Sequence, residues 1–409
     1  MGISMKKHIR IALAFLLAAV LSFSCAPAFA AATDEVKGEL KFNENGKFRI
    51  LIIADTQDTI HPRQETIDLM NAALDETNPD LVVFTGDNIH GPDLKIAKSE
   101  SRTTNAIKQI MEPVVSRNVA YCIVFGNHDD EGGISKEYQM ELYQSLGNCL
   151  SVEGADIKGC GNYNIPIKSS TGDKNIFNLW FMDSGSYNTD KNIDSFYDFV
   201  GTDQIEWYEQ TSNALKAEND GEPLPSFLFQ HIAVPEIYDV LTQVPKDTNG
   251  AVERDGKYYI LDEKFATGNM GEAPCPPNYN NGQFESWKKQ GDIVAAFFGH
   301  DHVNDFSASL DGIDMHYTPG AGFFIYGNGP EHGVRVVDIN EEDLSYTTEL
   351  LYYKDLVGDA VYGSDDLWYK GAAYHNQKTA TAVAAVVGVA AACGIGAAIF
   401  KCVRKKKIK

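Results

Sequence analysis

Three short apolar runs near the start of the chain constrain its fold more than any other feature. Residues 48–54, 81–85 and 120–125 are too short for helical periodicity and are largely apolar, which is typical of buried strands. Between them, residues 62–76 and 103–115 carry apolar side chains at helical spacing. This β-α-β-α-β series predicts parallel strands joined by right-handed crossovers.

The following part of the chain is richer in expected strands, and one expected helix, residues 203–217, interrupts them. The expected strands are residues 175–182, 226–229, 293–298, 306–310, 315–318 and 334–339. Two sheets packed face to face and flanked by helices account for this order. Long loops are expected at residues 91–100, 187–198 and 242–281, where they would shape access to a site.

Polar side chains follow five of these strands, at the point where each strand ends. The clusters are Asp55-Thr56-Gln57-Asp58, Gly86-Asp87-Asn88, Gly126-Asn127-His128-Asp129-Asp130, Gln230-His231 and Gly299-His300-Asp301-His302. Any one of them alone would be ordinary turn chemistry. Together, at the carboxyl ends of strands, they predict one shared site. Their carboxylate, amide and imidazole groups suit divalent manganese, iron or zinc.

The order of these motifs resembles the calcineurin-like metallophosphoesterase superfamily. The resemblance covers roughly residues 48–325, and the blocks Gly126-Asn127-His128-Asp129 and Gly299-His300-Asp301-His302 are its most specific parts. The residues around these two blocks look most like the branch of purple-acid-phosphatase-related phosphohydrolases. The resemblance implies a four-layer α/β/β/α sandwich, a site for two divalent metal ions, and hydrolysis of phosphomonoesters or phosphodiesters.

The resemblance also implies a role for each motif residue. Asp87 would bridge two metal ions through its two carboxylate oxygens. The other expected ligands are Asp55 and His302 for the first ion and Asn127, His231 and His300 for the second. A hydroxide activated by both metals would attack phosphorus. His128 would act as general acid or as hydrogen-bond donor to the phosphoryl group, with Asp129 as the candidate to orient it.

One position departs from the family's pattern. The first motif of the family usually reads Asp-x-His, and this chain has Asp55-Thr56-Gln57. Three interpretations stay open. Gln57 binds the first metal through its amide oxygen, which favours harder ions such as manganese or magnesium. Alternatively, Gln57 lies behind the ligands and the first metal binds weakly, or the site holds one metal or is inactive.

Two classes of function follow from these residues. The first is a phosphatase-type hydrolase of small phosphoesters, with a nucleotidase or a cyclic phosphodiesterase as the alternative substrate assignment. The second is a surface binding or adhesion protein on a catalytically degenerate scaffold of the same fold. Gln57 and an expected membrane anchor favour the second class.

The two ends of the chain resemble membrane-targeting segments. Residues 1–30 combine a basic start, an apolar run at residues 11–23 and an Ala28-Phe29-Ala30 cleavage pattern, which predicts a signal peptide. A lipoprotein signal at Cys25 is the alternative.

Residues 379–400 contain no charge in 22 positions, enough for a helix about 33 Å long that spans a bilayer. The basic residues 401–409 then predict a cytoplasmic tail. We therefore expect an exported, single-pass protein whose domain, residues 31–378, lies outside the cell membrane.

The distribution of charge limits the partners of this domain. Of the 35 basic residues, nine lie in the terminal segments, which leaves 26 against 57 acidic residues, a net charge of −31. A domain with this negative charge repels nucleic-acid polymers, so a small phosphoester is the expected substrate. Cys149 and Cys160 flank a turn-rich segment, and a disulfide between them is one arrangement for an exported domain. The pairing among Cys122, Cys149, Cys160 and Cys275 stays open.

Overall fold

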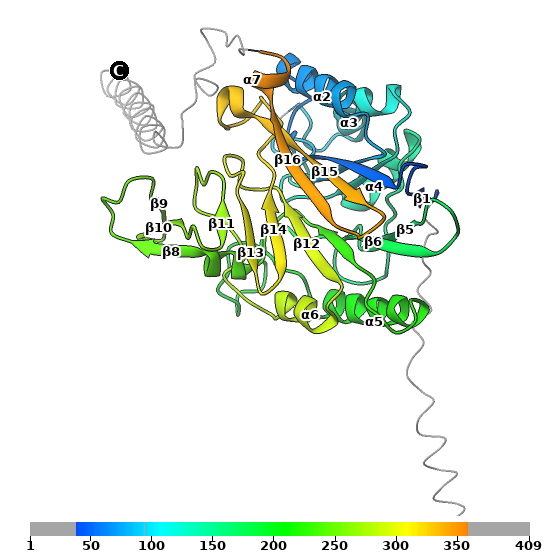
Figure 1. Cartoon of the computed structure of the whole chain (residues 1–409). Coiled ribbons are helices and arrows are strands. Elements are labelled where there is room, and N and C mark those ends of the chain that lie inside the picture. The colour runs from blue at the N-terminus through cyan, green and yellow to red at the C-terminus, as the bar shows by residue number, and fades with distance from the viewer. Residues whose placement is uncertain (1–37, 94, 359–409) are drawn as a thin grey trace, which may run out of the picture. The chain divides into compact units, whose positions relative to one another are not determined.

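The structure is a computed structural model that describes residues 38–93 and 95–358 (Figure 1). The signal peptide expected at residues 1–30, the membrane helix expected at residues 379–400 and the basic tail at residues 401–409 lie outside these residues. Within the part of the chain that the structure describes, none of the helices combines the length and apolar character that a bilayer crossing requires.

The first sheet contains the predicted β-α-β-α-β series. Its strand order is β16-β15-β2-β3-β4, formed by Tyr346–Tyr352, Gly333–Asn340, Lys47–Ile53, Leu81–Thr85 and Tyr121–Val124. Strands β2, β3 and β4 are parallel, whereas β15 pairs antiparallel with both β2 and β16. All five residues of β3 are buried, as expected for a parallel strand covered on both faces.

The second sheet is also mixed and has eight strands. Its order is β1-β5-β6-β7-β12-β14-β13-β11, formed by Leu40–Lys41, Tyr163–Lys168, Asn175–Phe181, Ser226–Phe229, Ile293–Phe298, Ile313–Tyr317, Ser307–Leu310 and Ala266–Thr267. The central strands β6, β7, β12 and β14 are parallel. Strands β7 and β12 coincide with the predicted ranges, so the carboxyl ends that carry His231 and His300 are confirmed.

Helices cover the outer faces of both sheets. The helices are α2 Gln64–Thr77, α3 Glu100–Ser116, α4 Lys136–Ser145, α5 Thr202–Glu218, α6 Gln283–Gln290 and α7 Tyr353–Leu356, with 3₁₀ turns at Pro235–Val240 and Gly329–Glu331. Figure 1 shows α2 and α3 on one side of the two sheets and α5 and α6 on the other.

Three apolar cores separate these layers. One core packs α2 and α3 against the first sheet, as Leu74 and Phe84 illustrate. A second lies between the sheets and includes Ile52 and Phe229. The third lies between the second sheet and α5 and α6 and includes Trp287. The expected sandwich of two sheets flanked by helices is therefore confirmed, because each sheet buries apolar side chains on both faces.

The expectation of one long loop at residues 242–281 is wrong. This segment contains most of a three-stranded antiparallel sheet, built by β8 Leu241–Val244, β10 Lys257–Leu261 and β9 Val252–Arg254, and then the short strand β11. Most residues of β8 and β10 are partly or fully exposed. Without a buried face, these strands lack the hydrophobic alternation by which a sequence reveals a strand.

The four cysteines are free among the described residues, so the arrangement with a bridge between Cys149 and Cys160 is not the one formed. The Cys149 thiol lies beside the Tyr121 hydroxyl, whereas the backbone N–H of Cys160 donates to Asp183. Burial raises the pKa of the Cys160 thiol, which keeps it protonated at neutral pH.

Candidate metal centre

The structure brings the residues of the five polar clusters into one buried site at the carboxyl ends of β2, β3, β4, β7 and β12. The exposed fraction of the seven expected ligands lies between 0% and 7%. These residues are Asp55, Gln57, Asp87, Asn127, His231, His300 and His302. Because parallel strands of the two facing sheets end at the same edge, residues from distant parts of the chain meet there.

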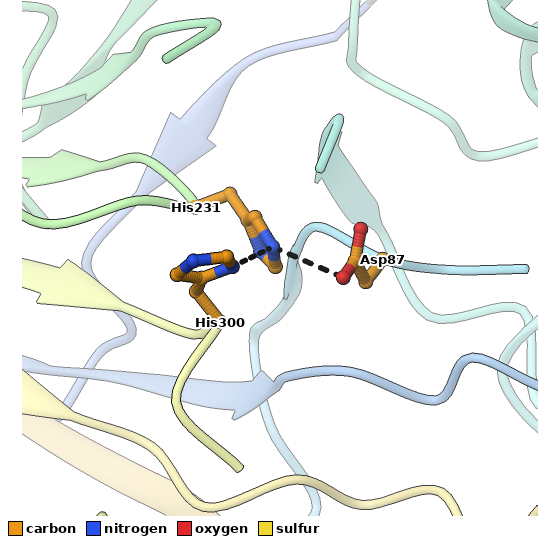
Figure 2. A group of neighbouring side chains, drawn as sticks. All are labelled: Asp87, His231 and His300. Atoms are coloured by element: carbon orange, nitrogen blue, oxygen red, sulfur yellow. Dashed lines mark hydrogen bonds and ion pairs between the residues drawn. The ribbon is translucent and has the colours of Figure 1, made fainter. Parts of the chain in front are cut away.

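Two groups of ligand atoms share one carboxylate. The ligand atoms of Asp87, His231 and His300 all lie within 4.8 Å of one another (Figure 2). Those of Asp55, Asp87 and His302 form a second group within the same limit. Asp87 belongs to both groups, as a carboxylate must if it is to bridge two cations.

Backbone carbonyls fix two of the imidazoles. Nδ1 of His231 lies 2.9 Å from the carbonyl oxygen of Thr85, which can only accept, so Nδ1 carries the proton. Nε2 of His231 then faces Oδ2 of Asp87 at 3.2 Å. In the same way Nδ1 of His302 donates to the carbonyl of Tyr326 at 3.0 Å, and its Nε2 lies 3.4 Å from Oδ1 of Asp55. Such outer contacts orient metal-binding histidines.

Two of the three histidines in the site carry an additional proton, which a bound cation can replace. Burial alone would lower the pKa of His231, but the Asp87 carboxylate raises it to about 9. His302 is likewise raised to a pKa of about 9, by Asp55 against the effect of burial. Burial and the neighbouring His231 lower the pKa of His300, which is therefore neutral and free to ligate. Bound cations would take the place of the two imidazolium protons.

Buried polar atoms without hydrogen-bond partners also indicate a metal site. Within residues 38–93 and 95–358, Gln57 Oε1 and Asn127 Oδ1 are buried without a hydrogen-bond partner. An orphaned buried polar atom costs about 1–3 kcal/mol, so two at one place require an explanation. Both atoms are metal-ligand types, and Nδ1 of His300, the nitrogen that faces the other ligands, lies 3.3 Å from Nε2 of His231. The residues present therefore fit a pair of divalent ions.

The backbone at the site is strained. Asp55, Gln57, Asp87 and His300 have φ angles of 50°, 34°, 48° and 75°, the left-handed region that costs energy for residues other than glycine. Two glycines allow the ligands to approach. A Cβ on Gly126 would lie 2.2 Å from Oδ1 of Asp87, and one on Gly299 would lie 2.6 Å from Oδ2 of Asp55. The surrounding fold thus holds the ligands in positions that local preference opposes.

His128 lies beside the ligands, and Glu131 contacts its side chain. The backbone N–H of His128 donates to Oδ1 of Asp87 at 2.8 Å. Its Nδ1 contacts Oε2 of Glu131, and 28% of the His128 side chain is exposed. The imidazole is therefore both oriented by a carboxylate and accessible to a ligand.

The role expected for Asp129 needs correction, because its carboxylate bonds to backbone rather than to His128. It accepts from the N–H groups of Gly126 at 2.7 Å, Asn88 at 2.8 Å and Ile89 at 3.1 Å. Burial and the nearby Asp87 carboxylate raise the pKa of Asp129 to about 7. Asp129 thus ties the two motif loops together, and the structure gives the orienting role to Glu131.

Sequence reasoning missed two residues that complete the site. The hydroxyl of Tyr187 donates to Oε1 of Glu131 at 2.8 Å and accepts from Nδ2 of Asn127 at 3.1 Å. The hydrogen bond from Nδ2 of Asn127 to Tyr187 fixes the orientation of the Asn127 amide and leaves its oxygen free to ligate a metal. Glu131 follows the Gly-Asn-His-Asp-Asp block directly and stands three residues after His128, a spacing that offered a signal. Tyr187 lies in a loop without a recognisable motif.

Comparison with known proteins agrees with this geometry. The profile of the calcineurin-like phosphoesterase family matches residues 48–304. The chain belongs to this family. The probable inactive purple acid phosphatase 14 of Arabidopsis thaliana is 30% identical over 372 residues, which cover 81% of this chain and 86% of that protein.

Two further relatives cover a similar share of the chain. The probable inactive purple acid phosphatase 29 of Arabidopsis thaliana is 32% identical over 339 residues, 74% of this chain and 80% of that protein. Phosphatase DCR2 of Saccharomyces cerevisiae is 28% identical over 334 residues, 74% of this chain and 53% of that protein. The chain therefore combines a metallophosphoesterase fold with buried aspartate and histidine groups of a metal site.

Proposed function

We propose that this chain is a phosphoester hydrolase that depends on two divalent cations and acts on a small phosphomonoester or phosphodiester. The observation that carries the proposal is that Asp87 is shared by two groups of buried ligand atoms. The unpartnered oxygens of Gln57 and Asn127 support it, since each group then gains an amide ligand. Asp55, Gln57 and His302 would hold one cation with Asp87.

The remaining ligands, Asn127, His231 and His300, would hold the second cation with Asp87. When bound, the cations would supply a water-derived nucleophile at neutral pH and neutralise charge on the phosphoryl oxygens. His128 donates a proton or a hydrogen bond to the leaving oxygen, and Glu131 holds its imidazole in position. Manganese, iron and zinc suit this mixed oxygen and nitrogen set, and the amide of Gln57 favours the harder manganese.

A non-catalytic binding protein on the same scaffold is the second candidate. Both Arabidopsis relatives described above carry the word inactive in their names, and Gln57 stands where the family's first motif usually has histidine. Such a protein would not turn over phosphoesters with any cation. It would also keep its binding function after removal of metal.

The test uses the full-length protein, stripped of metal and reloaded with manganese, zinc, iron or magnesium. Bound metal is counted, and hydrolysis of an aryl phosphate monoester and a diester is assayed in the same samples. We expect two cations per chain and turnover that follows the second cation. One cation or none, with no turnover under any metal, would favour the binding protein.

Two variants separate catalysis from metal binding. His128→Ala should lower turnover at least 100-fold while two cations remain bound, because His128 is not a ligand. His61→Ala removes an exposed imidazole outside the site and is the matched control. Loss of metal from the His128 variant would contradict its assignment as a proton donor.

We also propose that the domain acts on the outer side of the cell membrane. The basic and apolar start of residues 1–30 and the uncharged residues 379–400 support this location. Protease added to intact cells should digest the domain and spare an epitope placed after residue 409. A digested epitope on intact cells would contradict the proposed orientation.

A further inference from the structure

A loop between β6 and α5 places three aromatic rings next to the metal centre. Its residues 187–197, called here the aromatic hairpin, are closed by an antiparallel bridge between Tyr187 and Tyr197. The Tyr197 ring meets His300 edge-on, with the ring centroids 4.5 Å apart. Tyr187 stacks on Tyr197 at 5.8 Å, and Phe196 contacts both rings, at 5.5 Å and 5.0 Å. The rings form a continuous path from a metal ligand to the surface.

The outermost ring of this path is open to solvent. Phe196 is 67% exposed, more than any other large hydrophobic side chain in the described ranges. Single exposed hydrophobic residues are common and need no explanation. Phe196 differs because it is packed in place by two tyrosines that themselves border the site. Its ring offers a flat apolar face on the solvent side of two tyrosines that border the metal centre.

Hydrogen bonds hold the aromatic hairpin in one conformation. Nδ2 of Asn188 donates to the carbonyls of Asp190 at 3.1 Å, Ile193 at 2.8 Å and Ser195 at 3.1 Å. The hydroxyl of Ser195 donates to the carbonyl of Tyr197 and accepts from the N–H of Asn278 at 3.0 Å. The position of the rings is thus set before any ligand arrives, which lowers the entropy lost on binding.

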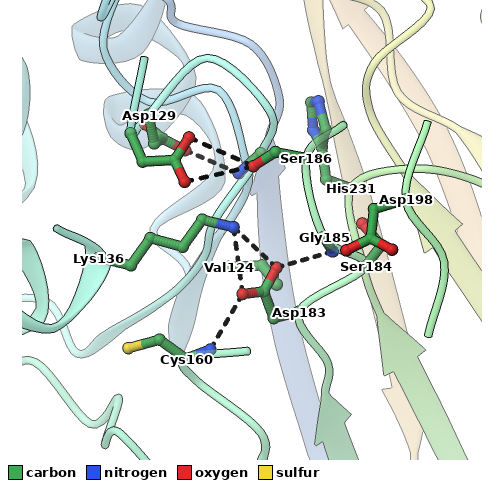
Figure 3. A network of polar contacts seen from close by, with 12 residues as sticks. Val124, Asp129, Lys136, Cys160, Asp183, Ser184, Gly185, Ser186, Asp198 and His231 are labelled. Carbon is green, nitrogen blue, oxygen red and sulfur yellow. Dashed lines mark hydrogen bonds and ion pairs between the residues drawn. The ribbon is translucent and has the colours of Figure 1, made fainter. Parts of the chain in front are cut away.

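A buried ion pair anchors the segment that precedes the hairpin (Figure 3). Nζ of Lys136 lies 3.0 Å and 3.1 Å from the two carboxylate oxygens of Asp183. The same carboxylate accepts from the N–H groups of Cys160 and Gly185, at 3.0 Å and 2.9 Å. These contacts fix the chain just before Tyr187.

The hairpin also contacts Glu131, which holds the expected proton donor His128. Tyr187 bonds to Asn127, an expected metal ligand, and to Glu131, which contacts His128. An ester whose phosphoryl group lies at the metals and whose leaving oxygen faces His128 would therefore extend its leaving group toward the hairpin. A planar leaving group would meet the face of Phe196.

We propose that the aromatic hairpin is a substrate subsite, in which Phe196 stacks on the planar ring of an aryl or nucleoside leaving group. The inference rests on the proposed function and extends it to a substrate class. Phosphoesters of planar ring alcohols are preferred over esters of flexible alkyl alcohols such as glycerol. Stacking of this kind corresponds to about a 3- to 10-fold preference for each ring contact.

The experiment compares two substrates on the manganese-loaded full-length protein. The ratio of kcat/KM for adenosine 5′-monophosphate to that for glycerol phosphate is measured for the wild type, Phe196→Ala and Phe196→Leu. Both variants should lower the ratio about 3- to 10-fold, since leucine keeps apolar volume but loses the flat ring. Tyr258→Ala on β10, which removes a partly exposed ring of the three-stranded sheet, is the matched control and should leave the ratio unchanged.

A binding measurement separates failure of the inference from failure of the proposed function. Both esters stay intact in a His128→Ala background, so calorimetry can measure their Kd values. The measurement is made with Phe196 present and in Phe196→Ala. A nucleotide preference that disappears in Phe196→Ala supports the subsite, whether or not the wild type turns over. Equal ratios and equal Kd values in the wild type and the Phe196 variants would overturn the subsite. Absence of turnover by the wild type would overturn only the proposed hydrolase.

Discussion

Replacing Gly126 by alanine tests whether Asp87 controls both metal positions. The added Cβ would lie 2.2 Å from Oδ1 and 2.4 Å from the backbone nitrogen of Asp87. Ordinary contact begins near 3.4 Å, so the carboxylate would have to move by about 1.2 Å and the backbone nitrogen of Asp87 by about 1.0 Å. The φ angle of Gly126 lies outside the left-handed region, so alanine adds no backbone strain. The perturbation is therefore purely steric.

A displacement of this size should affect both cations, because Asp87 belongs to both groups of ligand atoms. We expect each metal to bind at least roughly tenfold more weakly. A shift of about 1 Å in a reacting group costs on the order of 100-fold in rate, so turnover with saturating metal should fall by that factor. Metal titration by calorimetry and hydrolysis of an aryl phosphate measure the two effects separately.

Gly172→Ala is the matched control. Gly172 lies in the turn between β5 and β6, and its added Cβ would meet only Oγ of Ser169 at 3.4 Å. Thermal unfolding verifies that both variants fold, and Asp87→Asn replaces Gly126→Ala if the latter does not. Two cations bound with wild-type affinity and turnover within twofold of the wild type would refute the reasoning.

Three further predictions concern the residues around the metals. Glu131→Gln should lower kcat about 10- to 100-fold with unchanged metal content, because His128 loses the carboxylate that holds it. A change in metal content would show that Glu131 supports the metal ligands instead. Gln57→His should tighten zinc binding at the first position by roughly tenfold, since imidazole is the better zinc ligand; an unchanged titration would mean that Gln57 does not ligate. His231 and His302, each with a pKa of about 9, carry a proton at pH 7 in the metal-free protein and must lose it to bind metal. Calorimetry in buffers of different ionisation enthalpy should therefore report release of about two protons and affinity that rises from pH 6 to pH 9, and absence of proton release would contradict this charge state.

The central strands and the ligands at their ends were predictable for one physical reason. Strands β2, β3 and β4 are buried in the sandwich, so their sequences are short apolar runs without helical spacing. Polar residues directly after such a run can lie only at the end of the strand. The parallel direction of β7 and β12 relative to each other then brought His231 and His300 to the same edge.

Elements with exposed faces were not predictable in this way. Strands β8 and β10 have mostly partly exposed or exposed residues, and their sequence shows no apolar alternation. Helices α4 and α6 are short, with ten and eight residues, so their periodicity extends over little more than two turns. Their positions depend on packing against neighbours rather than on a local pattern.

The sequence by itself determined which strands are buried, which polar residues follow them and therefore which ligand types meet at the site. Only the tertiary structure decided how those residues are paired. It assigned Asp129 to backbone N–H groups and Glu131 to His128, and it brought Tyr187 from a distant loop onto Asn127. The physical reason is that a buried strand consists of apolar residues, so its burial can be read from the local sequence. The pairing of polar side chains depends instead on loop paths and on backbone angles such as the φ of 48° at Asp87. Contacts with distant parts of the chain impose these angles.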